Sequence, residues 1–439
     1  MSQNQSSSNS FTRRRFLQYS GGLALSGSLL AACAGTGAGG GGTANGNSNL
    51  PNLTQWYHQY GEKGTEQAVR SYAKNYTKAN VTVKWVAGVG NAYGNSVNTA
   101  LLGSSAPDIF EQSALSVDQV KQGLLAPLDD IFAAHKDDFL PASVKPFTVN
   151  GHVYAIKMLN DPTFIYYRKS MFQKANITKI PTTIDELIDA AKKVSAANNV
   201  KSIYIGPDAG VDALHQIAIW ASGPQQDLLS ADNKVIFNTD RVANMYLKIH
   251  ELNATGNVLP DATDFWWSIN PFLNGSVAMQ WCGLWAMPQV VTALKDDFGI
   301  FPLPGLDAQS DPATVDGGWA EMVYAKGKNV AAAKAYVESL WIDNATVQKD
   351  WNVAYGFHIP PRVSTSAQTD KLKTGPAADA VNILNKYGHS ATPYWNAAME
   401  TYLEDAVSKI LKGGGTASNA KTLLDQAAEK CNTELQKEL

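Results

Sequence analysis

Short strand-like and helix-like segments alternate along the first part of the chain, and this alternation restricts the possible folds more than any other feature. Runs rich in β-branched and aromatic residues predict strands at residues 53–57, 81–86 and 108–110. Apolar residues at helical spacing predict helices at residues 65–78, 96–102 and 116–122. Because parallel strands need crossover helices between them, the alternation predicts an α/β fold built on a parallel sheet.

The carboxyl ends of the predicted strands carry side chains suited to binding a polar organic ligand. In open α/β sheets, ligands bind beyond these ends, where this chain places Trp56, Tyr57 and Glu111. Because side chains alternate along a strand, we expect one of Trp56 and Tyr57 to face the ligand and the other the core. We expect Glu111 to contact the ligand, because burying a carboxylate in the core is costly. Gly88–Gly90 lacks the spacing of a dinucleotide-binding loop.

The rest of the chain continues the α/β pattern and then becomes mainly helical. Strands are predicted at residues 153–156, 164–167 and 202–206, with a turn at residues 160–162. A capping box at Thr183 predicts the start of a helix. Helices are predicted in the C-terminal third at residues 330–342, 346–351, 376–385, 395–411 and 419–437.

The first 49 residues differ from this body and resemble an export leader. Arg13–Arg15 precede a short apolar segment that ends in Leu30–Cys33, the order of a secretory signal. The apolar segment is too short and too rich in glycine and serine to span a bilayer. The arginines resemble a twin-arginine signal, which we favour over the general secretory route. Leu30–Cys33 resembles a bacterial lipobox, which implies that Cys33 carries lipid; the alternative is an ordinary cleavage site beside a chance cysteine. We assign residues 1–33 to the signal and 34–49 to a flexible, uncharged linker.

Composition excludes several classes of protein. The chain of 439 residues has 36 basic and 39 acidic side chains, without the basic excess of a nucleic-acid-binding protein. Its three cysteines are too few for a disulfide scaffold. Cys282 and Cys431 could pair or remain two buried thiols. The seven histidines are never three to five residues apart, so no local zinc motif and no metal or cofactor is predicted.

One cluster of motifs resembles a known family. Residues 270–279 followed by Gly283–Trp285 are similar to the F-x-x-G-x-x-A-M…G-x-W signature of extracellular solute-binding proteins, the maltose-binding-like receptors of ATP-driven sugar importers. Residues 300–305 are similar to the proline-rich strand of that family, and residues 317–320 to its glycine turn. Together with the lipobox, the order and spacing of these motifs support the resemblance.

A crossover motif of the same family is matched with two departures. Residues 151–156 and 166–169 are similar to the G-K-x-Y-G-h-P…h-Y-Y-N-K pattern. Lys157 stands where proline is usual, and Arg168 stands in place of asparagine. The resemblance runs from about Leu50 to the C-terminus.

The resemblance implies a type II periplasmic-binding-protein-like fold, in which two lobes, each a sheet flanked by helices, are joined by a hinge. We assign residues 50–159 plus 276–315 to the N-terminal lobe and residues 160–275 plus 316–439 to the C-terminal lobe, with crossings near Leu159, Ser276 and Val315. Ligand binding between the lobes would close them. The resemblance further implies recognition of the closed form by the permease of an ABC importer, with no chemistry on the ligand and no catalytic residue.

A carbohydrate ligand is implied, because aromatic rings stack on sugar faces and carboxylates accept hydrogen bonds from hydroxyls. By resemblance, Trp285 takes the family's stacking position and Trp395 a helix start where an aromatic residue is frequent. We also expect contacts from Trp319, with hinge packing as the alternative, and from Trp267 in an aromatic pair. Asp161 precedes a proline at the predicted turn and is either a ligand contact or a plain turn residue.

Alternative functions remain open from the sequence. The same fold could bind a polyamine, a metal chelate or a phosphorylated polyol. A polyamine requires convergent acids and a phosphate requires arginines, for which Arg362 is the candidate. A glycoside hydrolase needs two carboxylates, for which Glu111 and Asp161 are candidates. The eleven tryptophans favour a neutral sugar. The expected protein is a monomeric, lipid-anchored extracytoplasmic receptor without a nucleic-acid partner.

Overall fold

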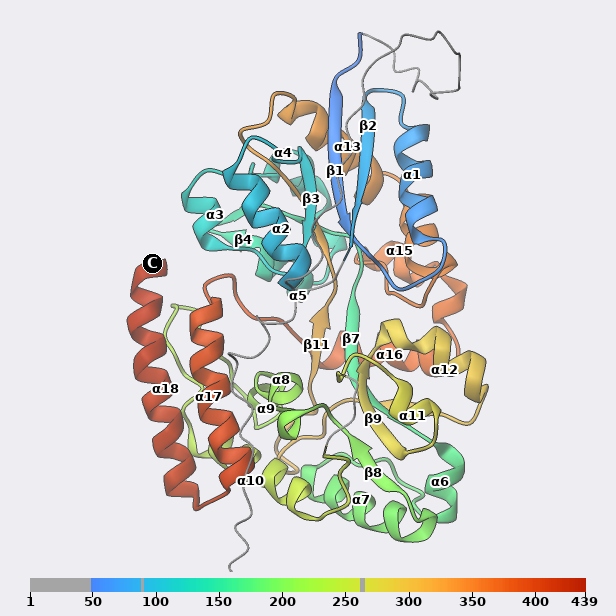
Figure 1. The fold of residues 1–439 in the computed structure, drawn as a ribbon, viewed down its shortest axis with the longest axis vertical. Coiled ribbons are helices and arrows are strands. Elements are labelled where there is room, and N and C mark those ends of the chain that lie inside the picture. The colour runs from blue at the N-terminus through green and yellow to red at the C-terminus, as the bar shows by residue number, and fades with distance from the viewer. Residues whose placement is uncertain (1–48, 88–90, 261–264) are drawn as a thin grey trace, which may run out of the picture. The chain divides into compact units, whose positions relative to one another are not determined.

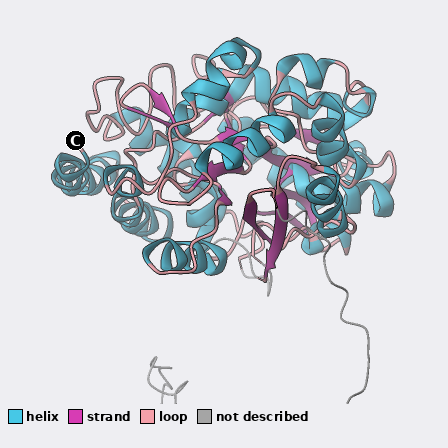
Figure 2. Ribbon diagram, turned by 90° about the horizontal axis from the view of Figure 1, so that it is seen from above, coloured by secondary structure: helices cyan, strands magenta, loops and turns pink. Residues whose placement is uncertain are grey.

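The computed structural model describes residues 49–87, 91–260 and 265–439. The predicted signal segment with Cys33, and the predicted linker up to residue 48, lie outside the described residues. The strands of the described body form two main sheets, each belonging to one lobe (Figure 1). Helices surround the strands when the body is seen from above (Figure 2). The predicted two-lobe α/β fold is confirmed.

The N-terminal lobe contains a five-stranded sheet in the order β2-β1-β3-β12-β6. Its strands are β1 (Asn52–His58), β2 (Asn80–Val86), β3 (Ile109–Gln112), β6 (Ile156–Lys157) and β12 (Ala320–Val323). β1 is parallel to both β2 and β3, whereas β12 is antiparallel to β3. A separate hairpin consists of β4 (Thr148–Val149) and β5 (His152–Val153). The helices of this half are α1 (Thr65–Asn75), α2 (Asn91–Leu102), α3 (Val117–Lys121), α4 (Asp129–Phe132), α5 (Pro141–Val144), α13 (Val330–Trp341), α14 (Ala345–Lys349) and, packed against α14, α15 (Val363–Ala367).

The C-terminal lobe contains a sheet in the order β13-β11-β7-β9-β8, with β10 paired to β7. Its strands are β7 (Asp161–Tyr167), β8 (Lys201–Tyr204), β9 (Val277–Gly283), β10 (Gly299–Phe301), β11 (Thr314–Gly317) and β13 (Gly388–His389). Its helices are α6 (Lys169–Lys174), α7 (Ile184–Asn198), α8 (Val211–Leu214), α9 (Ile217–Trp220), α10 (Asp240–Ala254), α11 (Asn270–Leu273), α12 (Met287–Leu294), α16 (Gly375–Tyr387), α17 (Ala397–Gly413) and α18 (Ala417–Glu438).

The lobe boundaries differ from the predicted ones. Within the described residues the chain passes between the sheets at residues 158–160, at 318–319 and between Trp351 and Ile359. The assignment of residues 276–315 to the N-terminal lobe is wrong, because β9 pairs with β7 and β8 inside the C-terminal sheet. Conversely, β12, α13 and α14 belong to the N-terminal lobe. β9 is buried at all seven positions, as expected for an interior strand and not for a hinge.

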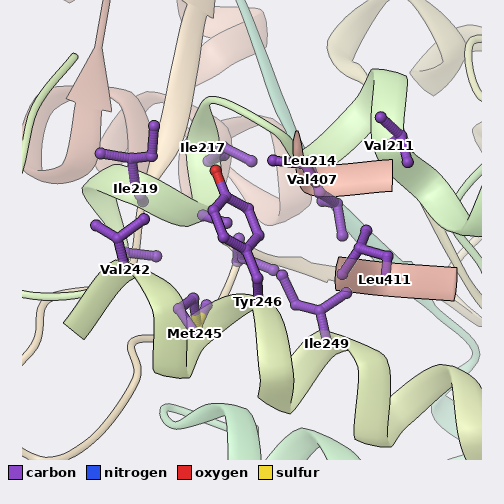
Figure 3. Close-up of a cluster of buried hydrophobic side chains, with 14 of the residues drawn as sticks. Val211, Leu214, Ile217, Ile219, Val242, Met245, Tyr246, Ile249, Val407 and Leu411 are labelled. Atoms are coloured by element: carbon purple, nitrogen blue, oxygen red, sulfur yellow. The ribbon is translucent and has the colours of Figure 1, made fainter. Parts of the chain in front are cut away.

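Amphipathic helices cover the C-terminal sheet and supply much of its core. Thr239 caps α10 by accepting a hydrogen bond from the backbone N–H of Val242, and the inward face of the helix follows at helical spacing. Figure 3 shows this face packed against residues of α8, α9 and α17. Burying each such side chain contributes about 1.5–3 kcal/mol. The labelled α10 residues are Val242, Met245, Tyr246 and Ile249.

The core of the N-terminal lobe contains a carboxylate. Glu321 on β12 lies opposite Glu111 on β3 and is fully buried. Gln55 donates a hydrogen bond to it, and Tyr57 lies beside it. Burial raises the pKa of Glu321 to about 7, with the charge of Glu111 adding to the effect. This side chain therefore changes charge near neutral pH inside the sheet that supports the N-terminal lobe.

We expect Glu321 to make the protein less stable as the pH rises. Its folded pKa lies above the unfolded value of about 4.3, so its stabilising contribution is complete below pH 4.3 and is lost as the pH approaches 7. The loss amounts to about 3 kcal/mol. Glu321→Gln should therefore gain stability relative to the native protein between pH 5 and pH 8, measured by urea unfolding.

The exposed substitution Glu429→Gln on α18 serves as the control and should show no such gain. An equal difference between native protein and Glu321→Gln at both pH values would contradict the prediction.

Candidate functional site

The topology of the N-terminal sheet places the carboxyl ends of its parallel strands beside the crossings. β1, β2 and β3 are parallel, so their carboxyl ends share one edge. β12 enters the sheet directly from the crossing at residues 318–319, and its first residue, Ala320, pairs with Gln112 at the end of β3. The edge that holds these strand ends therefore lies beside the crossing.

The C-terminal sheet presents the equivalent edge. β7 starts at a crossing and runs antiparallel to β9, so that Thr163 near its start pairs with Gly283 at the end of β9. β8 is parallel to β9, and its carboxyl end lies on the same side. Both lobes thus direct the carboxyl ends of their parallel strands toward the crossings, where ligands of α/β sheets bind.

Four aromatic side chains gather at this edge of the C-terminal lobe, and we call them the aromatic shelf: Phe265, Trp266, Trp267 and Trp285. Phe265 and Trp267 stack with ring centroids 4.3 Å apart, and their exposed fractions are 55% and 41%. The ring centroid of Trp266 lies 5.8 Å from that of Trp267 and 5.8 Å from that of Trp285. Exposed aromatic rings in contact with one another form a surface suited to flat, partly apolar ligands.

A glycine at the end of β9 permits this arrangement. A Cβ atom at Gly283 would lie 1.9 Å from the Trp285 ring, so only glycine lets the indole cover the strand end. The indole N–H of Trp285 donates to the carbonyl of Trp267 over 3.1 Å. That bond joins the segment after β9 to the segment before α11.

Acidic side chains lie next to the shelf. The indole N–H of Trp266 donates to Asp212 Oδ2 over 2.6 Å. Burial raises the pKa of Glu404 on α17, and the nearby charges of Glu400, Asp212 and Asp405 add to this effect. The charge of His215 opposes it, but the pKa is raised overall. The shelf thus contacts the carboxylate of Asp212, and Asp212 in turn lies near enough to Glu404 for their charges to interact.

His215, Glu400 and Glu404 bring ligand atoms within 4.8 Å of one another, a spacing that could hold a metal ion. However, His215 Nε2, Gln216 Nε2 and the Trp395 indole N–H already contact the Glu400 carboxylate. Burial alone would lower the pKa of His215, but the hydrogen bond and charge of Glu400 raise it overall. These contacts describe a closed hydrogen-bond network, with Glu400 as its central acceptor.

The edge of the N-terminal lobe carries a second aromatic group around Glu111. Glu111 Oε1 accepts from the backbone N–H of His58 at 2.6 Å and lies 2.5 Å from His58 Nδ1, while Oε2 accepts from the Tyr60 hydroxyl at 2.6 Å. The imidazole of His58 stacks on Trp319, with centroids 3.9 Å apart and planes inclined by 23°. Trp319 is half-buried and sits in the crossing between β11 and β12.

Buried ion pairs connect the crossings. His358 Nδ1 lies 2.6 Å from Asp161 Oδ1, and His358 Nε2 lies 3.0 Å from Glu62 Oε1. Burial alone would lower the pKa of His358, but Asp161 and Glu62 raise it to about 10. His358 is therefore an imidazolium at neutral pH. Lys157 Nζ and Asp316 Oδ1 form a second buried pair at 2.7 Å.

Comparisons with known proteins agree with this geometry. Residues 51–340 match the family described as bacterial extracellular solute-binding protein. The chain belongs to this family. The diacetylchitobiose binding protein DasA of Streptomyces coelicolor is 25% identical over 413 residues, which cover 89% of this chain and 93% of that protein. The arabinooligosaccharide-binding protein of Bacillus subtilis is 22% identical over 322 residues, covering 71% and 73%.

Solved structures share the fold. The GacH receptor of Streptomyces glaucescens, determined unliganded and with acarbose, superposes with a TM-score of 0.74 at 23% identity, covering 88% of this chain and 99% of that one. The sugar-binding protein MalE of Xanthomonas citri gives 0.70 at 18% identity, covering 87% and 98%. Members of the family are extracellular binding proteins.

The structure brings some of the predicted site residues of this solute-binding protein to the facing edges. Trp267 and Trp285 lie in the aromatic shelf, Trp319 lies at a crossing, and Asp161 begins β7. Asp161 occupies no turn, contrary to expectation, because β7 extends through it and Pro162. Its carboxylate is 6% exposed and is paired with His358.

The other predicted contacts are buried. Trp56 is 8% exposed beneath Lys84, whereas Tyr57 is fully buried, and the expectation that one of the two faces the ligand stays a prediction. Each packs into a different core cluster, because β1 is an interior strand covered on both faces. Glu111 is fully buried and accepts hydrogen bonds from His58 and Tyr60, and the ligand contact expected of it stays a prediction. Trp395 packs in the C-terminal core and donates to Glu400.

Sequence reasoning missed Asp212, Phe265, His58 and His358. Applying the strand-end rule to the predicted strand at residues 202–206 would have pointed to the segment that contains Asp212. The roles of His58 and His358 depend on partners more than fifty residues away. No local pattern reveals such pairs.

The structure shows the state of the two body cysteines and the partners of Arg362. Cys282 and Cys431 are both free and buried, and burial raises the pKa of the Cys282 thiol to about 12. Arg362 bonds Asp138 and the carbonyl of Ile342. In the part of the chain that the structure describes, no helix has both the length and the apolar character needed to cross a membrane.

We expect His358→Gln to destabilise the protein by about 3–5 kcal/mol, because it leaves Asp161 and Glu62 without their buried counter-charge. The stabilisation from His358 is complete below its unfolded pKa of about 6.5 and is lost as the pH rises through about 10. Urea unfolding at pH 7 measures the change.

His152→Gln is the matched control, because His152 forms an exposed ion pair with Asp129, and its cost should stay below about 1 kcal/mol. Similar losses in both variants would refute the assignment of a buried, charged His358.

Proposed function

We propose that this protein is a receptor that binds a mono- or oligosaccharide between its lobes and delivers it to an ABC importer. The observation that carries the proposal is the exposed aromatic shelf in contact with the carboxylate of Asp212 at the strand ends of the C-terminal lobe. Aromatic rings stack on the C–H faces of sugars, and carboxylates accept hydrogen bonds from their hydroxyls. The relatives named for diacetylchitobiose and arabinooligosaccharide binding support the same ligand class.

The energetic requirement is modest. A micromolar dissociation constant corresponds to about −8 kcal/mol. Stacking on the shelf and on Trp319, together with hydrogen bonds to Asp212 and Glu404, supplies this after the cost of ordering the ligand. A ligand that contacts both lobes favours their closed arrangement, and the crossings are the segments that bend. The permease of the importer would recognise that arrangement.

The proposed protein performs no chemistry on its ligand. A hydrolase of sugars needs two available carboxylates flanking the scissile bond. The two candidates from the sequence are both engaged, Glu111 by His58 and Tyr60 and Asp161 by His358. This engagement supports binding over hydrolysis.

A cationic solute is the second candidate. Asp212 contacts the shelf and interacts with the charge of Glu404, and aromatic rings together with acids also recognise ammonium groups. An amino sugar or polyamine would exploit this charge. A phosphorylated polyol is disfavoured, because Arg362 is already occupied by Asp138.

We further propose that Cys33 carries a lipid anchor, that residues 34–49 link it to the body, and that the monomeric receptor is exported by the twin-arginine route. The support is the order of arginines, apolar segment and Leu30–Cys33 in the sequence. Detergent phase partitioning of the native protein and of Cys33→Ser tests the anchor: native protein in the detergent phase and variant in the aqueous phase are expected.

Thermal-shift screening of residues 50–439 should identify the ligand class. The panel contains diacetylchitobiose, arabinotriose, maltotriose, glucosamine, spermidine and glycerol phosphate. A ligand at 100 times its dissociation constant stabilises the folded state by about 2.7 kcal/mol, which produces a measurable rise in Tm. We expect the rise with a sugar, recovered intact.

A rise with spermidine alone would instead support the cationic candidate, and recovery of cleaved sugar would support the hydrolase.

Trp285→Ala and Trp267→Ala should each weaken sugar binding by about tenfold or more, because each removes a stacking surface. Trp267 is 41% exposed, so its removal should change Tm little. Isothermal titration calorimetry measures the affinity. Leu102→Ala, an exposed apolar residue on α2, is the control and should bind as the native protein does. Unchanged affinity in both tryptophan variants would exclude the shelf as the binding surface.

A further inference from the structure

Glu111 is a fully buried carboxylate with three hydrogen-bond donors directed at it. One oxygen receives the backbone N–H and Nδ1 of His58, and the other receives the Tyr60 hydroxyl. Since a carboxylate only accepts, Nδ1 of His58 carries a hydrogen. Burying such a group is costly unless it is fully paired, as it is here. The three contacts hold the residues that follow β1 in a single arrangement.

The held imidazole supports an aromatic ring at the crossing. The rings of His58 and Trp319 stack at 3.9 Å, and the edge of Tyr93 meets Trp319 at 5.8 Å with planes inclined by 80°. Tyr93 is itself fixed, because its hydroxyl donates to the carbonyl of Trp56 and accepts from the backbone N–H of Glu111. Two neighbours of Glu111 therefore contact the Trp319 ring from different directions.

The backbone and the ring of Trp319 have different partners. Gly318 precedes it with φ of +117°, a conformation that residues with a side chain rarely adopt. The carbonyl of Trp319 accepts from the backbone N–H of Met158. The main chain is thus anchored to the first crossing, and the half-buried ring contacts the His58 and Tyr93 side chains.

We propose that Glu111 is a positioning residue that acts through His58 to hold the Trp319 ring in the orientation in which it stacks on the ligand. The inference rests on the proposed function, in which Trp319 contacts the sugar. Glu111 itself does not touch the ligand. It fixes the imidazole, and the imidazole stacks on the indole.

The test separates the stack from the hydrogen bond. His58→Ala and His58→Phe both remove the Nδ1 contact to Glu111, but only phenylalanine keeps a ring beneath Trp319. The ligand-free measurement is the ¹⁹F spectrum of protein labelled with 5-fluorotryptophan, in which Trp319→Phe assigns the Trp319 signal. The binding probe is diacetylchitobiose, measured by isothermal titration calorimetry.

In His58→Ala we expect the Trp319 signal to shift and broaden and the affinity to fall by about tenfold, the loss of one aromatic contact. His58→Phe should restore only part of both, because its ring lacks the hydrogen bond to Glu111. Glu111→Gln keeps an acceptor for His58 and should resemble the native protein, whereas Glu111→Ala should resemble His58→Ala. A folded His58→Ala with a native Trp319 signal overturns the proposal, and so does a His58→Phe variant that behaves as the native protein.

Binding and ¹⁹F results distinguish failure of the proposed function from failure of the inference about Glu111. If Trp319→Ala binds diacetylchitobiose as tightly as the native protein, Trp319 is not a ligand contact, and the inference about ligand stacking falls with it. If the native protein does not bind diacetylchitobiose, the ¹⁹F spectra alone decide whether Glu111 and His58 orient the ring. If Glu111→Ala does not fold, the two His58 variants decide.

Discussion

Buried charge at the crossings is the constraint on which the arrangement of the two lobes depends. His358 joins Glu62 of the N-terminal lobe to Asp161 at the start of β7, and Lys157 of β6 joins Asp316 of β11. Buried ion pairs add little net stability compared with apolar packing, but removing one partner is severe, because the other charge stays buried. Such pairs therefore specify which segments must meet. Here they bring together chain segments that are between about 160 and 300 residues apart.

Once the crossings are fixed, the strand directions determine where ligand groups can gather. β7 and β12 each begin at a crossing and run away from it, so the neighbouring strands that are antiparallel to them end there. Trp285 of the aromatic shelf follows β9, and the group around Glu111 lies at the ends of β1 and β3. Each lobe thus contributes a different surface, with exposed indoles beside Asp212 on one side and a supported Trp319 on the other. In the proposed binding surface, the C-terminal lobe therefore supplies most of the aromatic rings and the N-terminal lobe supplies Trp319.

Local elements could be predicted from the sequence, whereas burial and long-range pairing could not. The capping box at Thr183 and the helices of the C-terminal third appear as predicted, because caps and apolar periodicity are local. The predicted lobe boundaries were wrong because the sequence motif at β9 does not reveal which strands pair with it. Trp285 and Trp395 look alike in sequence, but Gly283 opens space for the first and the C-terminal core encloses the second. Trp56 and Tyr57 alternate between the two faces of β1 as expected, but the sequence did not reveal that both faces of this interior strand are covered.

The interrupted course of each lobe has a consequence for the speed of folding. β3 ends at Gln112, but its partner β12 begins only at Ala320, so a chain emerging from the ribosome cannot complete the N-terminal sheet until most of it has been made. Contacts that close such long loops slow folding, since the loss of chain entropy precedes the gain from pairing. The nascent protein therefore remains incomplete for longer than a chain of equal length with two contiguous domains. During that interval it exposes the edges of β3 and β7 to chaperones and to the export machinery.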